Sequence, residues 1–409
     1  MDRKRKVHSL IDKVYSKRNL ELAWEKVKSR KGSGGIDGMT IEHFEERKGE
    51  QLERLHRLLK EDAYQPKAVR RVLIPKPDGG QRKLGIPTIL DRVCQQALVN
   101  RMEGIFERKF LSCNFGYRPG KSPHNALRYV WKELNAGYCW IVDADLRDYF
   151  TSINQEKLVD LIAEEISDRR VLGLIRRMLQ AGVMQGKNWE PSLTGVPQGG
   201  VASPLWSNIF LHPFDEAMTR RGHRLCRWAD DFVILCRTKE EAQVVLEEAR
   251  RFLKEKLGVE LHPGKTQVVH VSWGFTFLGY KIRQGKGLKL PREKLTSRVN
   301  VRHLYAIPSD KSQKRFKEQI RNLTRRKAPL TLAEAIDQLN PVIRGWGNYY
   351  RKAHVKGLFH RLDNWIQHRL YSMRAKRWRN TMWRKYPSWR LYGEMGLVNL
   401  IGLVPSLQR

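Results

Sequence analysis

The stretch LCRWADDFVILC, residues 225–236, carries the strongest prediction about the fold. Two apolar arms enclose the adjacent carboxylates Asp230 and Asp231, a pattern that predicts a buried β-hairpin with the acids near its turn. Burying two ionised carboxylates without partners is costly, and like charges this close favour proton uptake. A bound divalent cation removes both costs, so the hairpin predicts a metal site. An ordinary solvated turn is the alternative interpretation.

A second acidic pair lies in the mostly apolar run YCWIVDADL, residues 138–146, which is typical of a buried strand. Asp143 and Asp145 are two residues apart and therefore share one face of that strand. If the strand packs beside the hairpin, three or four carboxylates converge, as two-metal phosphoryl transfer requires. Oxygen ligands without His or Cys favour Mg²⁺ over zinc. Asp148, at the start of the next turn, is expected to be solvated or to cap a helix.

The charge balance points to a polyanionic partner. The 409 residues include 78 Lys and Arg against 43 Asp and Glu, a formal net charge of +35. The surplus is spread along the chain, which indicates extended contact with a polyphosphate backbone. A basic structural protein without catalysis would show the same charge. The length and the 41% hydrophobic content predict a globular protein of two to four subdomains.

Membrane, secretory and cysteine-based signals are missing from the sequence. No run of 18 apolar residues occurs, and the N-terminus MDRKRKVHSLIDK lacks an apolar signal core, so we expect no membrane partner and a cytoplasmic location. The five cysteines form no C-x-x-C pair, which argues against a disulfide framework or a cysteine zinc site.

Periodicity and capping signals give a coarse order of elements. Helices are expected over residues 8–30, 41–61, 90–110, 155–181 and 239–257, and from residue 205 onward, with strands at 71–74 and 268–282. After residue 290, acids become rare while Lys, Arg and Trp increase. Ser309 is expected to cap a helix ending near residue 325, and Thr331 another, with Glu334 at capping-box spacing. The sequence therefore predicts an α+β body followed by a basic, mostly helical region.

Several further motifs are candidate ligand sites. Lys76 and Arg82 flank the turn in PKPDGGQRK and could hold a triphosphate, although a solvated basic turn looks the same. Gln198 lies in the glycine-rich loop PQGG, where backbone and amide can approach a nucleotide or simply lead into a helix. The motif GYRPGKS, residues 116–122, has three residues between its glycines where a phosphate-binding P-loop has four, so we reject an NTPase site.

Tryptophans alternate with basic residues in the C-terminal region. Trp365, Trp378, Trp383 and Trp389 lie among arginines and lysines. This pattern suits phosphate contact combined with base stacking. It suits equally the core of a small helical domain with a basic outer face.

In this order, the motifs resemble those of the reverse transcriptases encoded by bacterial group II introns, which also act as splicing maturases. The resemblance extends from about residue 20 to residue 365 and rests on nine motifs. They are SRKGSGGIDGMT, RVLIPKPDGGQRKLGIPTILDR, NFGYRPGKSPHNAL, WIVDADLRDYF, TGVPQGGVASPLWSNIFL, RWADDFVILC, LGVELHPGKT, FTFLGYKI and RGWGNYY.

The resemblance implies an α+β right-hand polymerase, with fingers and a palm built on an antiparallel sheet, followed by an α-helical thumb or maturase domain. It implies an N-terminal extension with a template-contacting insertion at residues 1–65 and fingers and palm at 66–290. The thumb or maturase domain would span 291–375. A basic, Trp-rich segment at 376–409 would follow, with DNA binding as its expected role.

The resemblance also implies roles for individual residues. Asp145, Asp230 and Asp231 match the catalytic triad, which with Leu146 would bind two Mg²⁺ ions, and Asp143 is accessory. The residues expected to bind the dNTP are Lys76 and Arg82 at the triphosphate, Phe150 at the sugar 2′ side, and Gln198. Primer or template contacts are implied for Trp228, Lys265, Gly34 and Gly35. RNA or DNA contacts in the thumb and C-terminus are implied for Arg344, Trp346, Arg351, Arg377 and Arg384.

The chain departs from the family pattern at two points. Trp228 stands where the family usually has the tyrosine of Tyr-Ala-Asp-Asp, which could alter primer positioning or fidelity. No Cys- and His-containing H-N-H nuclease motif follows the thumb, so the compact class of intron proteins is expected.

The expected function is Mg²⁺-dependent copying of an RNA template into cDNA from a DNA primer. Binding of group II intron RNA would assist splicing and insertion into target DNA. A domesticated reverse transcriptase of phage defence or DNA repair, and an RNA-binding maturase without polymerase activity, are the alternatives.

Overall fold

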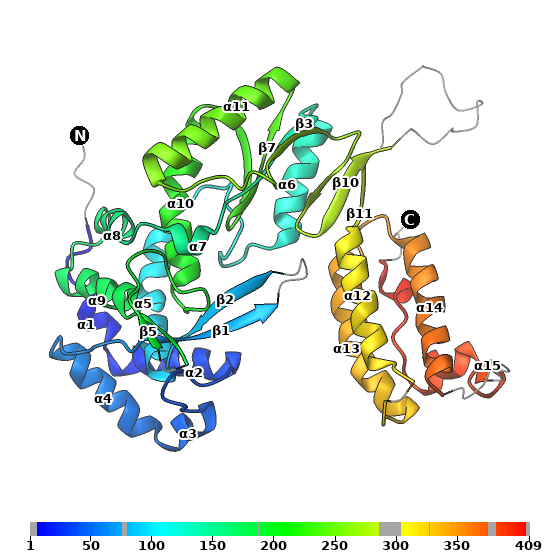
Figure 1. Cartoon of the computed structure of the whole chain (residues 1–409), viewed down its shortest axis with the longest axis horizontal. Helices are drawn as coiled ribbons and strands as arrows, with labels where there is room; N and C mark the ends of the chain where they lie inside the picture. The colour runs from blue at the N-terminus through cyan, green and yellow to red at the C-terminus, as the bar shows by residue number, and fades with distance from the viewer. Residues whose placement is uncertain are drawn as a thin grey trace. The chain divides into compact units, whose positions relative to one another are not determined.

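The computed structural model describes residues 6–75, 80–186, 188–285, 304–326, 328–374 and 382–405. The chain divides into two compact units, Met1–Val268 and Val269–Arg409, and each is described by itself. Figure 1 shows mixed helices and strands in the first unit and mostly helices in the second. This confirms the predicted α+β body with a helical C-terminal domain.

A four-stranded sheet with the strand order β6-β7-β3-β8 forms the centre of the first unit. Its strands are β3 (Trp140–Asp145), β6 (Arg224–Trp228), β7 (Asp231–Cys236) and β8 (Gln267–His270). β6 and β7 form the predicted hairpin, and β3 is the predicted buried strand, antiparallel to β7. Helices α6 (Pro123–Asn135) and α11 (Lys239–Phe252) pack against this sheet, as Figure 1 shows. α11 continues into the short π-helix η1 (Leu253–Leu257), so the predicted helix 239–257 is confirmed.

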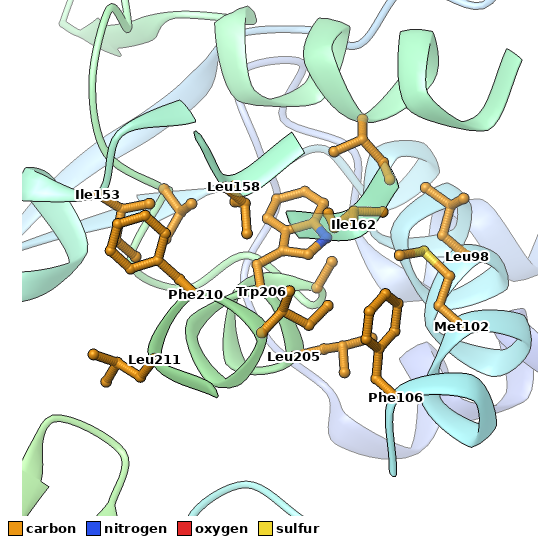
Figure 2. Close-up of a cluster of buried hydrophobic side chains, with 14 of the residues drawn as sticks. Leu98, Met102, Phe106, Ile153, Leu158, Ile162, Leu205, Trp206, Phe210 and Leu211 are labelled. Carbon is orange, nitrogen blue, oxygen red and sulfur yellow. The ribbon is translucent and has the colours of Figure 1, made fainter. Parts of the chain in front are cut away.

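The core of this unit lies where three helices meet: α5 (Ile89–Glu107), α8 (Gln155–Ala163) and α10 (Ser203–Arg220). Figure 2 shows Met102 and Phe106 from α5 beside Trp206 from α10. Trp206 and its neighbour Phe210 are fully buried. Each such side chain contributes about 1.5–3 kcal/mol through burial. This packed body fixes the helices that support the sheet.

Three of the predicted helices are each divided in two, so those predictions are wrong in continuity. α1 (Ile11–Val14) and α2 (Lys17–Arg30) are separated because Ser16 has extended backbone angles. α3 (Ile41–Glu46) and α4 (Lys48–Lys60) are separated at Arg47. α8 ends before residue 164, and α9 (Arg169–Gln180) begins anew because the Asp168 carboxylate caps its first backbone N–H groups.

A second sheet in this unit has the strand order β2-β1-β4-β5. It consists of β1 (Val69–Pro75), β2 (Gln81–Ile86), β4 (Val183–Gln185) and β5 (Asn188–Glu190). β1 and β2 form an antiparallel hairpin that includes the predicted strand 71–74. Lys76, which follows β1 in the sequence, lies outside the described residues.

The second unit begins with a small antiparallel sheet and continues as helices. β9 (Phe275–Phe277), β10 (Tyr280–Gln284) and β11 (Leu304–Pro308) form the sheet, so the predicted strand 268–282 is interrupted by turns. The helices are α12 (Asp310–Leu323), α13 (Leu332–Tyr350), α14 (Lys356–Arg374) and α15 (Met382–Lys385).

The capping signals of the second unit are confirmed. Ser309 caps α12, and Thr331 and Glu334 form the capping box of α13. In the part of the chain that the structure describes, no helix is both long and apolar enough to cross a membrane. The boundaries drawn at residues 65, 290 and 375 stay predictions.

Candidate active site

Four aspartates gather at one end of the central sheet. β3 and β7 are antiparallel with Asp145 directly opposite Asp231, and such cross-strand neighbours point to the same face with Cβ atoms roughly 5 Å apart. Asp143 lies two residues back along β3 on that face. Asp230 occupies the β6–β7 turn. The convergence expected from the sequence therefore occurs in the structure.

Three of these carboxyl groups, those of Asp143, Asp230 and Asp231, have raised pKa values. Burial raises the pKa of Asp231 well above its usual range, and the nearby carboxylates of Asp143, Asp145 and Asp230 raise it further. Burial, then Asp145, raises the pKa of Asp230. Burial also raises the pKa of Asp143 to about 6, although a hydrogen bond from Gln267 opposes the rise. The cluster therefore favours a bound positive charge.

Two polar side chains contact the acids from the segment before and within β8. The ammonium Nζ of Lys265 lies 2.6 Å from Asp145 Oδ2, and Gln267 Nε2 donates to Asp143 Oδ2 at 3.1 Å. Within the described ranges, no three His, Cys, Asp or Glu side chains stand in the geometry of a metal centre. The donors at this sheet end are carboxylate oxygens, however, and these are the ligands that Mg²⁺ prefers. The residues thus fit the expected ion in their chemistry.

The turn that carries Asp230 has an unusual backbone conformation. Trp228 pairs with Asp231, so the turn contains only Ala229 and Asp230. Ala229 has a φ of 59°, in the left-handed region that non-glycine residues seldom occupy. Gly116 lies against this turn, because a Cβ at Gly116 would stand 2.3 Å from the Ala229 nitrogen. Loop and turn therefore fit together only without a side chain at position 116.

A buried ion pair between Arg227 and Asp215 supports the β6–β7 turn. Arg227 and Asp215 are both fully inaccessible to solvent, and the guanidinium donates to both carboxylate oxygens, from Nε at 2.6 Å and from Nη2 at 2.5 Å. Arg227 Nη1 also donates to the Ala229 carbonyl at 2.9 Å and to Asn208 Oδ1 at 3.1 Å. Asn208 Nδ2 in turn donates to the Gly116 carbonyl at 2.8 Å. The sequence analysis missed this network, for which the only signal was a charged residue in an apolar strand.

The candidate nucleotide-binding residues come from three neighbouring segments. The Val196 N–H donates to the Phe150 carbonyl at 2.7 Å, and the Gly85 N–H donates to the Gln198 carbonyl at 2.7 Å. The loop that contains Gln198 is therefore hydrogen-bonded on one side to strand β2 and on the other to helix α7 (Tyr149–Ser152). These segments line a cavity of about 300 Å³.

Arg82, an exposed residue of β2, lies close enough to the acids to affect them. Burial and the charge of Asp145 raise the pKa of Asp230, and the positive charge of the Arg82 guanidinium partly opposes this rise. The hairpin of β1 and β2 is therefore coupled electrostatically to the β6–β7 turn that carries Asp230. Lys76, its predicted partner, lies outside the described residues.

Tyr117 is a candidate that the sequence analysis did not single out. It follows Gly116, has a φ of 56° and is 48% exposed. Burial raises the pKa of its hydroxyl, and the charge of Asp230 adds to the rise. An exposed aromatic side chain beside the turn that carries Asp230 suits contact with a base or sugar. The motif that contains Tyr117 was rejected as a P-loop and contributed to the family resemblance, but the sequence analysis gave Tyr117 itself no role.

The glycines assigned to template contact have structural reasons of their own. A Cβ at Gly34 would stand 2.5 Å from the Met39 carbonyl oxygen. A Cβ at Gly35 would stand 2.6 Å from Thr88 Cα, at the start of α5. Both positions therefore need glycine for packing, and template contact stays a prediction.

The candidates of the second unit differ in exposure. Arg344 and Arg351 are exposed, whereas Trp346 is half-buried and stacks on Phe316 with ring centroids 4.4 Å apart. Arg384 is exposed and lies 5.0 Å from the Trp383 ring centre. Arg377, like Trp378, lies outside the described residues.

Acids converging at the end of an antiparallel sheet, with cationic and amide side chains on neighbouring segments, are the arrangement expected in a nucleotidyl-transferring polymerase. Comparison with protein families agrees. Residues 74–282, about half of the chain, match the family described as reverse transcriptase (RNA-dependent DNA polymerase). Residues 313–390 match the group II intron maturase-specific domain. The chain therefore belongs to the reverse transcriptase family and carries a group II intron maturase domain, as the motifs predicted.

Curated relatives agree with this assignment. Protein YkfC of Escherichia coli is 34% identical over 286 residues, covering 61% of this chain and 75% of YkfC. The group II intron-encoded protein LtrA of Lactococcus lactis is 30% identical over 329 residues, covering 64% of this chain and 54% of LtrA. An uncharacterized 91 kDa protein in the cob intron of Schizosaccharomyces pombe is 26% identical, covering 83% and 50%. The chain thus spans half to three quarters of these relatives.

Proposed function

We propose that this protein extends a DNA primer on an RNA template, using dNTPs and two Mg²⁺ ions, and that it binds group II intron RNA to assist splicing and retrohoming into target DNA. The placement of Asp145 opposite Asp231, with Asp230 in the adjoining turn, carries the proposal. The maturase-domain match and the net charge of +35 support RNA binding. We place this activity in the cytoplasm.

Asp145, Asp230 and Asp231 would hold the ions, with the Leu146 carbonyl as a further oxygen donor. When bound, the ions would activate the primer 3′ hydroxyl and stabilise the pyrophosphate leaving group. The protein holds the acids ready, because Arg227 fixes the Ala229 carbonyl of the turn. Preformed geometry of this kind avoids reorganisation during the reaction.

The other candidates bind and orient the substrates. Arg82, together with Lys76, binds the triphosphate of the dNTP as a charge-assisted contact. Phe150 packs at the sugar 2′ position and Gln198 lines the nucleotide pocket. Trp228 and Lys265 lie next to the acids and position the primer end. The intact set of carboxylates favours this function over that of a maturase without polymerase activity.

The test is primer extension on an RNA template by Asp230→Ala. Extension should fall on the order of 10³-fold, because removing a metal ligand costs several kcal/mol of transition-state stabilisation. RNA affinity should equal that of the wild type. Asp148→Asn is the matched control, because Asp148 is a neighbouring exposed acid outside the cluster. Undiminished extension by Asp230→Ala would refute the site.

A binding measurement tests the ion independently of activity. Mg²⁺ at ten times its dissociation constant should stabilise the wild-type fold by about 1.4 kcal/mol. Thermal melting with and without Mg²⁺ should show this gain in the wild type and in Asp148→Asn, but not in Asp230→Ala. An equal gain in all three proteins would contradict binding at the acids.

A further inference from the structure

Lys265 is held beside the four aspartates of the sheet end by a turn whose backbone is fixed. The His262 N–H donates to the Asp145 carbonyl at 2.8 Å, and the Lys265 N–H donates to the His262 carbonyl at 3.1 Å. An isolated β-bridge between Leu146 and Leu261 joins the same two segments. The backbone of Lys265 is therefore tied to the end of β3, the strand that carries Asp145.

The side chain of Lys265 is much freer than its backbone. Its ammonium Nζ lies 2.6 Å from Asp145 Oδ2, yet 55% of the side chain is exposed, against 24% for Asp145. A lysine side chain is a flexible stem with a compact charge at its end. The ammonium can therefore leave the carboxylate for solvent without any change in the backbone.

The charge of Lys265 acts on more than one aspartate. Burial and the neighbouring carboxylates raise the pKa of Asp231, and the positive charge of Lys265 opposes that rise. Burial also raises the pKa of Asp230, and Lys265 again opposes the rise. Together with its contact to Asp145, Lys265 thus supplies positive charge to all three aspartates assigned to the metal site.

The Lys265 ammonium and a divalent ion compete for the same carboxylate. Mg²⁺ binds carboxylate oxygens at roughly 2.0–2.1 Å, in near-octahedral geometry. The ammonium is already hydrogen-bonded to Asp145 Oδ2, and two cations on one carboxylate repel each other. Gln267, which donates to Asp143 Oδ2 at 3.1 Å, carries no charge and presents no such conflict.

We infer that Lys265 is the built-in counter-ion of the metal site, and that its ammonium must leave Asp145 for a divalent ion to bind there. Until then, Lys265 offsets the repulsion among the aspartates and keeps them together. The released ammonium is free to reach the primer end. The inference rests on the proposed function in that the aspartates bind a divalent ion.

The substitution Lys265→Met tests the inference through the binding of Mg²⁺ alone, measured by isothermal titration calorimetry on the full chain without nucleic acid or nucleotide. The affinity for Mg²⁺ should rise about tenfold, because the variant lacks the positive charge that opposes the ion. Lys265→Arg keeps the charge and should restore the wild-type affinity. Lys254→Met is the matched control, since Lys254 is an exposed lysine 3.8 Å from the carboxylate of Glu260. It should bind Mg²⁺ as the wild type does.

Thermal melting gives a second readout that does not depend on activity. Without divalent ions, Lys265→Met should melt below the wild type, because the aspartates lose their counter-charge. With saturating Mg²⁺ the two melting temperatures should converge, so the gain from Mg²⁺ should be larger in Lys265→Met than in the wild type. Lys254→Met should show the wild-type gain.

Two results would overturn the inference. One is an affinity for Mg²⁺ in Lys265→Met that is equal to or below that of the wild type. The other is an equal rise in Lys265→Met and Lys254→Met, which would reflect net charge alone.

Asp230→Ala keeps this inference apart from the proposed function. If Mg²⁺ binds the wild type but not Asp230→Ala, and Lys265→Met binds it no more tightly, the counter-ion assignment fails and the metal site stands. If Mg²⁺ binds the wild type and Asp230→Ala alike, the metal site itself fails, and the inference fails with it.

Discussion

Two groups of aspartates in the first unit differ in whether the fold provides partners for their charge. We call the acids whose charge is met by hydrogen-bond donors or a counter-charge the satisfied group. Asp168, between α8 and α9, is buried and accepts backbone hydrogen bonds from Leu10, Ile11, Arg170 and Val171 at 2.8–3.3 Å. Burial raises its pKa, but these bonds outweigh burial and bring the pKa below its usual value. At the sheet end, burial and mutual repulsion raise the pKa of Asp231 and its neighbours. The fold supplies hydrogen-bond donors to Asp168, whereas the carboxylates at the sheet end lack enough positive charge and favour binding a cation.

Asp215 belongs with the satisfied acids and should give the largest change in stability. Asp215→Asn leaves the Arg227 charge buried without its counter-charge, which costs about 3–5 kcal/mol. Denaturant melting should show this loss, and primer extension should fall because the Ala229 carbonyl loses its fixed donor. Asp148→Asn should melt as the wild type does. A stability loss below about 1 kcal/mol would place Asp215 outside the satisfied group.

Asp168 should give the next largest change, with a defined dependence on pH. Asp168→Ala leaves four backbone donors without their charged acceptor and should cost about 2–3 kcal/mol at pH 7. A lowered carboxyl pKa stabilises the fold above the usual value of 3.8, and this contribution is lost as pH falls through that region. The difference from the wild type should therefore shrink below about pH 4. A difference that grows on acidification would contradict the assignment.

Asp143 should show a small change of the opposite sign. Its pKa of about 6 is higher than the usual 3.8, so the folded state holds its proton more tightly and unfolding becomes easier as pH rises from about 4 to 6. Asp143→Asn removes this cost. The variant should gain about 1 kcal/mol above pH 6 and nothing below pH 4, measured by melting without divalent ions. Destabilisation at pH 7 would move Asp143 into the satisfied group.

Local signals in the sequence were sufficient to predict that the four aspartates converge. The apolar hairpin with two acids, and the strand with two more, are each recognisable from the pattern of a few consecutive residues. The capping box of Thr331 and Glu334 is recognisable from two residues three positions apart. The helix breaks were not predictable in this way. Asp168 interrupts a periodic run because its carboxylate accepts hydrogen bonds from the backbone of Leu10 and Ile11, which lie far away in sequence.

The contacts that support the site were the part the sequence could not show. Arg227 and Asp215 are twelve residues apart and meet only when α10 packs against β6. Gly116 is one glycine among 31, and its close approach to Ala229 appears only in the folded chain. Positions defined by the space around them, rather than by their neighbours in sequence, required the structure.

The close fit of Gly116 under Ala229 has a consequence for variation. Any side chain at position 116 would collide with the backbone of the catalytic turn, and a bulky or β-branched residue at position 229 would be strained at its φ of 59°. A saturation library should therefore tolerate only glycine at 116 and only small or flexible residues at 229. With position 116 fixed as glycine, substitutions that adapt this protein should accumulate in the residues around the turn and not at Gly116.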